Sequence, residues 1–183
     1  MVSHYQTLSG FVIKRRNYRD YDRLITIFTA EQGKNTYLAK GVRKISSRRA
    51  GALELFNNIK FMVYQKHDLG LITEVSLLYS YQNLANDFYK TKIAFHLSEL
   101  IDRLTKEGQI YPQVYQLLEK SLSYLLNNKL SATQQDKVLL RLKLRILEML
   151  GFGLPDKIDN QQLTTYIESI IERNLVSLGV FTD

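Results

Sequence analysis

The clearest pattern in this chain is the stretch Ile59-Lys60-Phe61-Met62-Val63-Tyr64, which alternates between two faces. Ile59, Phe61 and Val63 fall on one face, and the more polar residues between them fall on the other. Successive side chains of a strand point to opposite sides of a sheet, so this pattern predicts a strand with one buried face. Four further segments before about residue 80 read as short strands separated by glycines and charged turns. They are residues 10–16, 23–29, 35–40 and 71–77.

Five short strands in about 80 residues, with no helical pattern long enough to cover them, predict a small closed barrel without exposed edges. After Asn86 the apolar residues recur with the period of helices. The predicted helices are 86–108, capped by Asn86 or Asp87; 112–128, starting at Pro112; 131–151, capped by Ser131 or Thr133; and 159–171, with Asp159 and Gln162 as a capping box. We therefore expect two domains: a barrel over residues 1–80 and an all-α domain of about four helices over residues 86–183.

Positive charge is concentrated in the first eighty residues. They contain 13 Lys and Arg against 6 Asp and Glu, which accounts for the whole formal net charge of +7. The densest part is Lys40-Gly41-Val42-Arg43-Lys44-Ile45-Ser46-Ser47-Arg48-Arg49. Because neutralising phosphates supplies most of the sequence-independent affinity for nucleic acids, this segment predicts a nucleic-acid footprint. A solvated loop that only aids solubility is the alternative from charge alone.

Several kinds of chemistry are not supported by the sequence. The absence of cysteine excludes disulfides, thiolate catalysis and Cys-based zinc sites, and the histidines His4, His67 and His96 are too far apart to suggest a metal site. No phosphate-binding glycine loop or common catalytic motif is present. The acidic pair Asp20 and Asp22 is better explained by ion pairing with neighbouring arginines than by catalysis. Because these motifs are missing, we expect a binding protein that has neither a catalytic site nor a cofactor. Because no membrane-spanning run or signal peptide is visible, we expect it in the cytoplasm.

Short motifs in the basic half follow one another in a specific order. They are residues 10–18 (GFVIKRRNY), 22–29 (DRLITIFT), 31–34 (EQGK), 39–44 (AKGVRK) and Phe56. In this order they resemble the N-terminal domain of the RecO family of bacterial recombination mediators. The resemblance covers residues 1 to about 80 and continues, with more divergence, into a helical domain ending near residues 147–152.

The resemblance implies an OB-fold barrel followed by a helical domain. It also implies a protein that binds single- and double-stranded DNA, anneals complementary strands and acts with RecR to load RecA during DNA repair. In some family members the C-terminal tail of the single-strand-binding protein is a further partner. The implied location is the bacterial cytoplasm, in association with the nucleoid.

Typical family members continue after the position that Phe152 occupies in this chain with a module built on Cys-x-x-Cys that often holds zinc. This chain has no cysteine to carry over, so we expect a short member without that module. The family contributions of the module to DNA or RecR contacts are therefore not expected here.

An OB barrel binds a strand with a basic groove for the phosphates and aromatic faces for the bases. We expect the loop after the third strand to be mobile and to provide the main phosphate ligands. The leading candidates are Lys40, Arg43, Lys44, Arg48 and Arg49, the second group is Arg15, Arg16, Lys34 and Arg23, and the stacking candidates are Tyr37 and Tyr64. Either tyrosine is equally explained as part of the barrel core, and Arg23 could instead pair with a nearby carboxylate. Nothing suggests a base-reading element, so little sequence specificity is expected.

Two other classes of function fit the same residues. The neutral helical half could bind a protein partner while the basic half contributes little, which would make the chain an interaction scaffold. Alternatively, the barrel could bind RNA, because OB folds use the same physical interactions on both polymers.

Overall fold

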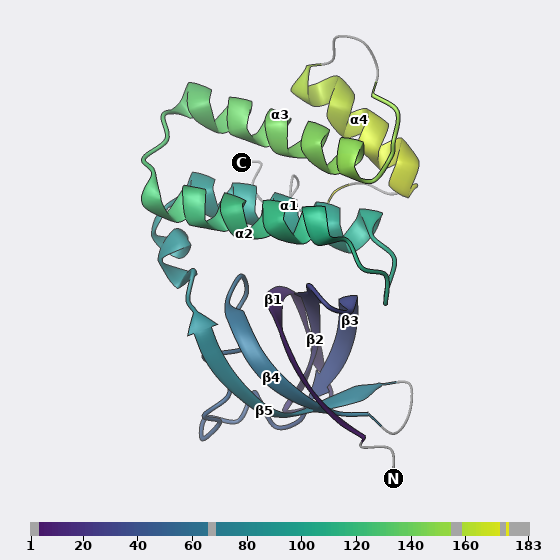
Figure 1. Cartoon of the computed structure of the whole chain (residues 1–183). Coiled ribbons are helices and arrows are strands. Elements are labelled where there is room, and N and C mark those ends of the chain that lie inside the picture. The colour runs from purple at the N-terminus through teal and green to yellow at the C-terminus, as the bar shows by residue number, and fades with distance from the viewer. Residues whose placement is uncertain (1–3, 66–68, 155–158, 173–174, 176–183) are drawn as a thin grey trace. The chain divides into compact units, whose positions relative to one another are not determined.

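The computed structural model describes residues 4–65, 69–154, 159–172 and Leu175, and the chain divides into two compact units. The barrel unit contains residues 1–82 together with 106–115, and the helical unit contains residues 83–105 and 116–183. Strands form the first and helices the second, in the order that the sequence predicts (Figure 1).

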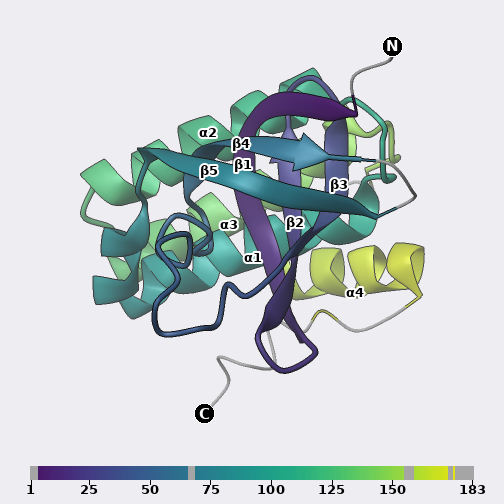
Figure 2. The same ribbon diagram turned by 90° about the horizontal axis from the view of Figure 1, so that it is seen from below.

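The five strands of the barrel unit form a closed barrel. They are β1 (Tyr5–Tyr18), β2 (Asp22–Thr29), β3 (Gly33–Ala39), β4 (Asn58–Tyr64) and β5 (Gly70–Tyr79). Their order is β1-β2-β3-β5-β4, and neighbours are antiparallel except for β3 and β5. The long β1 pairs with β4 through its first half and with β2 through its second half, and so closes the barrel (Figure 2). The predicted OB-fold is confirmed.

The alternating stretch in β4 has the buried face that its pattern predicts. Ile59, Phe61 and Val63 are at most 1% exposed and pack in the barrel core with Ile25 and Ile27 of β2. On the opposite face of β2, the buried Phe28 contacts Tyr115, with 6.0 Å between ring centroids. This second contact explains why β2 is apolar on both faces.

The β3–β4 loop, which contains the basic stretch, is attached to the barrel at several points. Val42 and Leu53 are buried in the barrel core. The Arg49 guanidinium donates to the carbonyls of Lys40 (2.6 Å) and Ile72 (2.8 Å), which ties the end of β3 to β5. The loop is therefore an integral part of the barrel, because its apolar residues need burial and its arginine satisfies backbone acceptors.

The segment Lys106–Tyr115, which the sequence places in the helical domain, belongs to the barrel unit. Gly108 N donates to Lys34 O (2.9 Å), and the Glu107 carboxylate accepts from Thr36 N (3.1 Å), so the segment lines the edge of β3. Gly33 has a φ of +65°, and a Cβ there would collide with the Gln109 carbonyl oxygen. Only glycine permits this close approach.

The helices of the chain begin close to the positions that the sequence predicts. They are α1 (Phe88–Leu104), α2 (Pro112–Asn127), α3 (Ala132–Met149) and α4 (Asn160–Ile171), and a short 3-10 helix spans Gln82–Asn86. Asp87 caps α1, Ser131 caps α3, and Asp159 forms the predicted capping box with Gln162 on α4. Among the described residues, no helix combines the length and apolar character needed to cross a membrane.

The helical unit buries positive charge at the contact between α3 and α4. Lys143 of α3 is 1% exposed, and its ammonium donates to Thr164 Oγ1 (2.7 Å) and to the Asn160 side chain (3.3 Å). Burial lowers the pKa of Lys143 to about 8, although the Glu168 carboxylate opposes the shift. His96 of α1 is fully buried, and burial together with the charges of Lys143 and Lys92 lowers its pKa to about 3.

Candidate nucleic-acid interface

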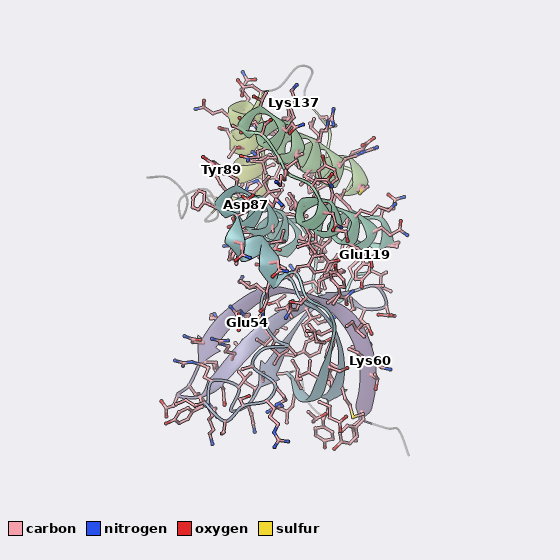
Figure 3. The ribbon with its side chains drawn as sticks, turned by 90° about the vertical axis from the view of Figure 1, so that its left-hand side faces the viewer. Glu54, Lys60, Asp87, Tyr89, Glu119 and Lys137 are labelled. Atoms are coloured by element: carbon pink, nitrogen blue, oxygen red, sulfur yellow. The ribbon has the colours of Figure 1, made fainter. Side chains whose placement is uncertain are left out.

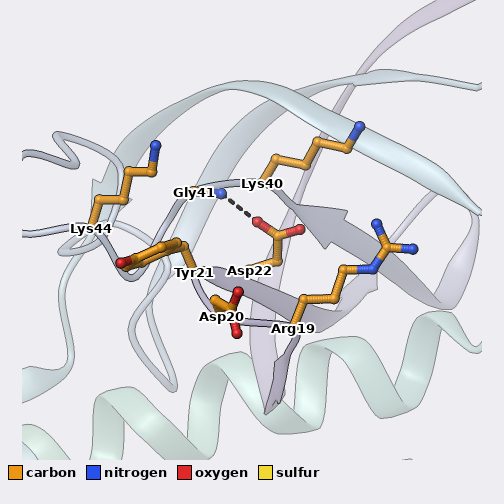
Figure 4. Close-up of a pocket in the computed structure, with 7 residues that line it drawn as sticks. All are labelled: Arg19, Asp20, Tyr21, Asp22, Lys40, Gly41 and Lys44. Carbon is orange, nitrogen blue, oxygen red and sulfur yellow. Dashed lines mark hydrogen bonds between the residues drawn. The ribbon is translucent and has the colours of Figure 1, made fainter.

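A surface hollow of about 490 Å³ lies between the β1–β2 turn and the start of the β3–β4 loop (Figure 4). It is lined by Arg19, Asp20, Tyr21, Asp22, Lys40, Gly41 and Lys44. The turn supplies Arg19, Asp20 and Tyr21, the start of β2 supplies Asp22, and the β3–β4 loop supplies the other three. Two segments about twenty residues apart in sequence thus form one site.

Hydrogen bonds that each involve at least one backbone atom hold the turn and the loop together. The Asp22 carboxylate accepts from Gly41 N (2.7 Å), and Arg43 N donates to Tyr21 O (2.9 Å). The Arg43 side chain also donates to the Asp20 carbonyl (3.1 Å). Arg19 and Gly41 have positive φ values of 51° and 65°, which turn the chain sharply on either side of the hollow. These contacts fix the backbone from which the charged side chains project.

Three cations surround the hollow. Arg19, Lys40 and Lys44 are exposed, and the Lys44 ammonium lies 5.6 Å from the centre of the Tyr21 ring. The Arg19 guanidinium lies 5.2 Å from the centre of the Tyr18 ring. Figure 4 shows the Lys44 side chain above Tyr21, and Lys40 and Arg19 on the other side of Asp22. The arrangement is suited to an anion that also has a flat apolar part.

Two further candidates from the sequence remain available to a ligand. Arg48 in the loop and Arg16 on β1 are exposed, and neither side chain makes a hydrogen bond or ion pair with another described residue. Arg16 directly follows Arg15 on β1, and successive side chains of a strand point to opposite faces. Arg16, which pairs with Leu24 of β2, therefore lies on the opposite face of β1 from Arg15.

Four of the predicted phosphate ligands are engaged within the protein, and one of them is Arg43, whose guanidinium donates to the Asp20 carbonyl. Arg15 pairs with the Glu54 carboxylate, and Arg23 lies 3.6 Å from the same group (Figure 3 shows Glu54). The internal partner of Arg23 is thus Glu54, while Asp22 accepts from the Gly41 backbone. Arg49 donates to backbone carbonyls, as described above. We therefore leave these arginines out of the proposed interface.

Two other candidates are buried. Lys34 is 9% exposed and lies where the 106–115 segment lines β3. Tyr37 is 3% exposed and packs edge to face on Phe61, with ring centroids 5.3 Å apart. Burial, with a smaller contribution from the Glu107 carboxylate, raises the pKa of Tyr37 to about 12. Neither side chain is accessible to a nucleic acid in this structure.

Tyr64 is half-buried and is not among the residues that line the hollow. It is the last residue of β4 and lies opposite the first residue of β1. Its ring contacts Tyr5 (5.0 Å between centroids) and His4 (6.0 Å). Tyr5 pairs directly with Tyr64 between β1 and β4 and is 53% exposed. These three rings form an aromatic cluster on the barrel unit that does not include Tyr21.

Sequence reasoning missed Arg19 and Tyr21 as site residues. In the sequence, Arg19 reads only as an ion-pair partner for the acidic pair, and nothing singles out Tyr21. One signal could have found them: the loop between the first two strands is a common ligand-binding loop of OB folds. Their contact with Lys40 and Lys44 depends on how the barrel brings the two loops together.

The usual ligand face of an OB barrel, on β2 and β3, is partly covered in this chain. Tyr115 packs on Phe28, and residues 106–108 follow the β3 edge beside Lys34 and Thr36. The uncovered end of these strands is the one next to the hollow, where Asp22 contacts Gly41.

The described part of the chain contains no group of three or more His, Asp or Glu side chains that could hold a metal ion. His4 contacts Tyr64, and His96 is buried in the helical unit, whereas His67 lies outside the described residues. The predicted absence of a zinc module after Phe152 also concerns residues 155–158, which lie outside the described residues.

Comparison with known proteins gives two family matches. Residues 1–81 match the family model "Recombination protein O N terminal", and residues 85–155 match "Recombination protein O C terminal". A chain of the S. pombe Stn1-ten1 crystal structure overlaps 52% of this chain and 76% of its own length, with a TM-score of 0.34 and 10% identity. That overlap is too weak to bear on fold or function.

Curated relatives carry the name DNA repair protein RecO. The protein from Desulfatibacillum aliphaticivorans is 36% identical over 80% of this chain and 57% of its own length. The protein from Symbiobacterium thermophilum is 30% identical over 79% of this chain and 56% of its own length. The chain thus spans slightly more than half the length of these relatives. Since the two family models follow each other along most of the sequence, the chain belongs to the RecO family of DNA repair proteins.

Proposed function

We propose that this chain binds single- and double-stranded DNA without sequence specificity and anneals complementary strands. It acts with RecR and the single-strand-binding protein to load RecA, at the DNA of the bacterial cytoplasm. The barrel unit holds the DNA, and the helical unit contacts protein partners. Its role is binding, not catalysis.

The observation that carries the DNA-binding proposal is the group of exposed cations on one end of the barrel. Lys40 and Lys44 border the hollow, Arg48 continues along the same loop, and Arg16 projects from the adjacent β1. Hydrogen bonds between the Asp22 and Arg43 side chains and backbone atoms hold the turn and the loop in place. Exposed cations that project from a fixed backbone bind phosphates with little dependence on the bases. We name these four side chains the cationic rim.

The test replaces the four residues of the cationic rim by glutamine in the full chain. Each phosphate contact on single-stranded DNA contributes about 0.7 to the slope of log K against log salt, so the slope should fall by roughly 2 to 3 units. The matched control replaces four exposed cations of the helical unit by glutamine: Lys120, Lys129, Lys137 and Arg141. Both variants lose the same charge. Equal affinity and slope in the rim variant and the unaltered chain would contradict the proposed interface.

The mediator role needs a separate measurement. We expect the full chain to accelerate annealing of complementary strands coated with single-strand-binding protein, and RecR to modify that rate. The rim variant should lose the acceleration, whereas the control variant should keep it. Equal acceleration by the rim variant would separate annealing from this surface. An RNA competitor that displaces labelled DNA at equimolar concentration would indicate binding without preference for DNA.

A further inference from the structure

We propose that the hollow beside Tyr21 holds one unpaired nucleotide, with its base stacked on the Tyr21 ring and its flanking phosphates bound by Lys40 and Arg19. This inference rests on the proposed DNA binding and makes it more specific. The cationic rim supplies affinity for any DNA, whereas Tyr21 supplies preference for single strands.

The Tyr21 ring has the exposure and position of a binding surface. It is 55% exposed, although its backbone carbonyl is fixed by Arg43 N at 2.9 Å. An aromatic ring on a fixed turn loses little conformational freedom when a base stacks on it. The hollow of about 490 Å³ is within the range of about 300 to 1,000 Å³ typical of small-ligand sites.

The charges around the ring distinguish a nucleotide site from a simple phosphate site. The exposed Asp20 carboxylate lies among the cations of the hollow and disfavours a phosphate beside it. A carboxylate can, however, accept a hydrogen bond from the amino group of a base. Lys44, now 5.6 Å from the ring centre, has a flexible stem and can turn its ammonium to a phosphate when a base takes its place.

Stacking on Tyr21 discriminates between single strands and duplexes. In a duplex both faces of each base are covered by its neighbours, and extruding a base costs free energy. An unpaired base pays much less to leave its stack, and stacking on an aromatic side chain changes affinity roughly 5- to 150-fold per base. Phosphate contacts, in contrast, are made with both forms of DNA.

The test compares Tyr21→Leu with the unaltered full chain on a single strand and on a duplex of the same length. We expect single-strand affinity to fall about tenfold and duplex affinity to stay within about twofold. Tyr124→Leu, at another exposed tyrosine, is the matched control and should change neither. Thermal unfolding of each variant checks that the fold is retained.

A second variant tests the contact directly. The chain contains no tryptophan, so Tyr21→Trp places a single indole in the hollow and keeps an aromatic face for stacking. Saturating single-stranded DNA should quench its fluorescence, and the duplex should not. An unchanged spectrum at saturation, or equal loss of single-strand and duplex affinity in Tyr21→Leu, would overturn the nucleotide site and leave the proposed function standing. Absence of DNA binding by the unaltered chain would contradict the proposed function and the nucleotide site together.

Discussion

The barrel unit and the helical unit use positive charge in opposite ways. Lys40, Lys44 and Arg48 project from the barrel into solvent, whereas Lys143 is buried between α3 and α4 with hydrogen-bond acceptors around it. A cation in water keeps its charge for a ligand, and a buried cation stabilises the fold only while its acceptors are present. The location of a basic residue therefore decides whether it contributes to binding or to stability.

The largest expected effect is at the buried cation. Lys143→Ala removes the hydrogen bonds to Asn160 and Thr164 and leaves a cavity, so the free energy of unfolding should fall by about 3 kcal/mol. Lys137→Ala on the same helix is the control, since Lys137 is exposed and points away from the helical unit (Figure 3). Its effect should be within about 0.5 kcal/mol in urea denaturation. Similar losses for both would remove the distinction between buried and exposed cations.

The next largest effect distinguishes an internally bound arginine from an exposed one within the barrel unit. Arg49 neighbours Arg48 in the basic stretch but donates to the carbonyls of Lys40, just after β3, and of Ile72 in β5. Arg49→Gln should lower the free energy of unfolding by about 2 kcal/mol, because it removes the donor to the partly buried Ile72 carbonyl and the tie to Lys40. Arg48→Gln should leave stability unchanged and weaken DNA binding. If Arg49→Gln bound DNA less tightly without losing stability, Arg49 would belong to the DNA-binding cations, which would contradict this prediction.

The smallest effect is a dependence of stability on pH in the helical unit. The pKa of His96 is lowered to about 3 in the folded state, against an ordinary value near 6.5. Between these values the unfolded state binds more protons, so stability is full above pH 6.5 and is lost as the pH falls toward 3. The loss from pH 6.5 to 5.5 should be about 1 kcal/mol. Chemical denaturation of the unaltered chain and of His96→Gln measures it, and an equal slope in both would contradict the assignment.

Local patterns are sufficient to predict most of the fold. The alternation of Ile59, Phe61 and Val63 predicts β4, and the caps Asp87 and Ser131 mark the starts of helices, because these signals act within a few residues. The pairing of residues 106–108 with the β3 edge was not predictable. It joins segments about seventy residues apart, and no periodicity in either segment records the contact.

The candidate site was less predictable than the fold. The density of the basic stretch indicated the right loop, but charge in a sequence does not show which arginine will meet an acceptor. In the folded chain, Arg15 and Arg23 meet the Glu54 carboxylate, and Arg49 meets the Ile72 carbonyl. Tyr21 could not be predicted as a site residue, because its place in the site depends on the basic loop that folds beside it. Lys44 of that loop lies over the Tyr21 ring.

The contact between Gly33 and Gln109 has a consequence for the order in which the chain folds. Residues 1–82 leave the ribosome well before residues 106–115, and synthesis proceeds at roughly 5 to 20 residues per second. For a few seconds the barrel therefore has an open β3 edge, which is a site for incorrect strand pairing. The later segment closes that edge through Gly108 and covers Phe28 with Tyr115. A fragment that stops at residue 82 would keep the edge open, so its tendency to associate would reflect incomplete folding of the barrel.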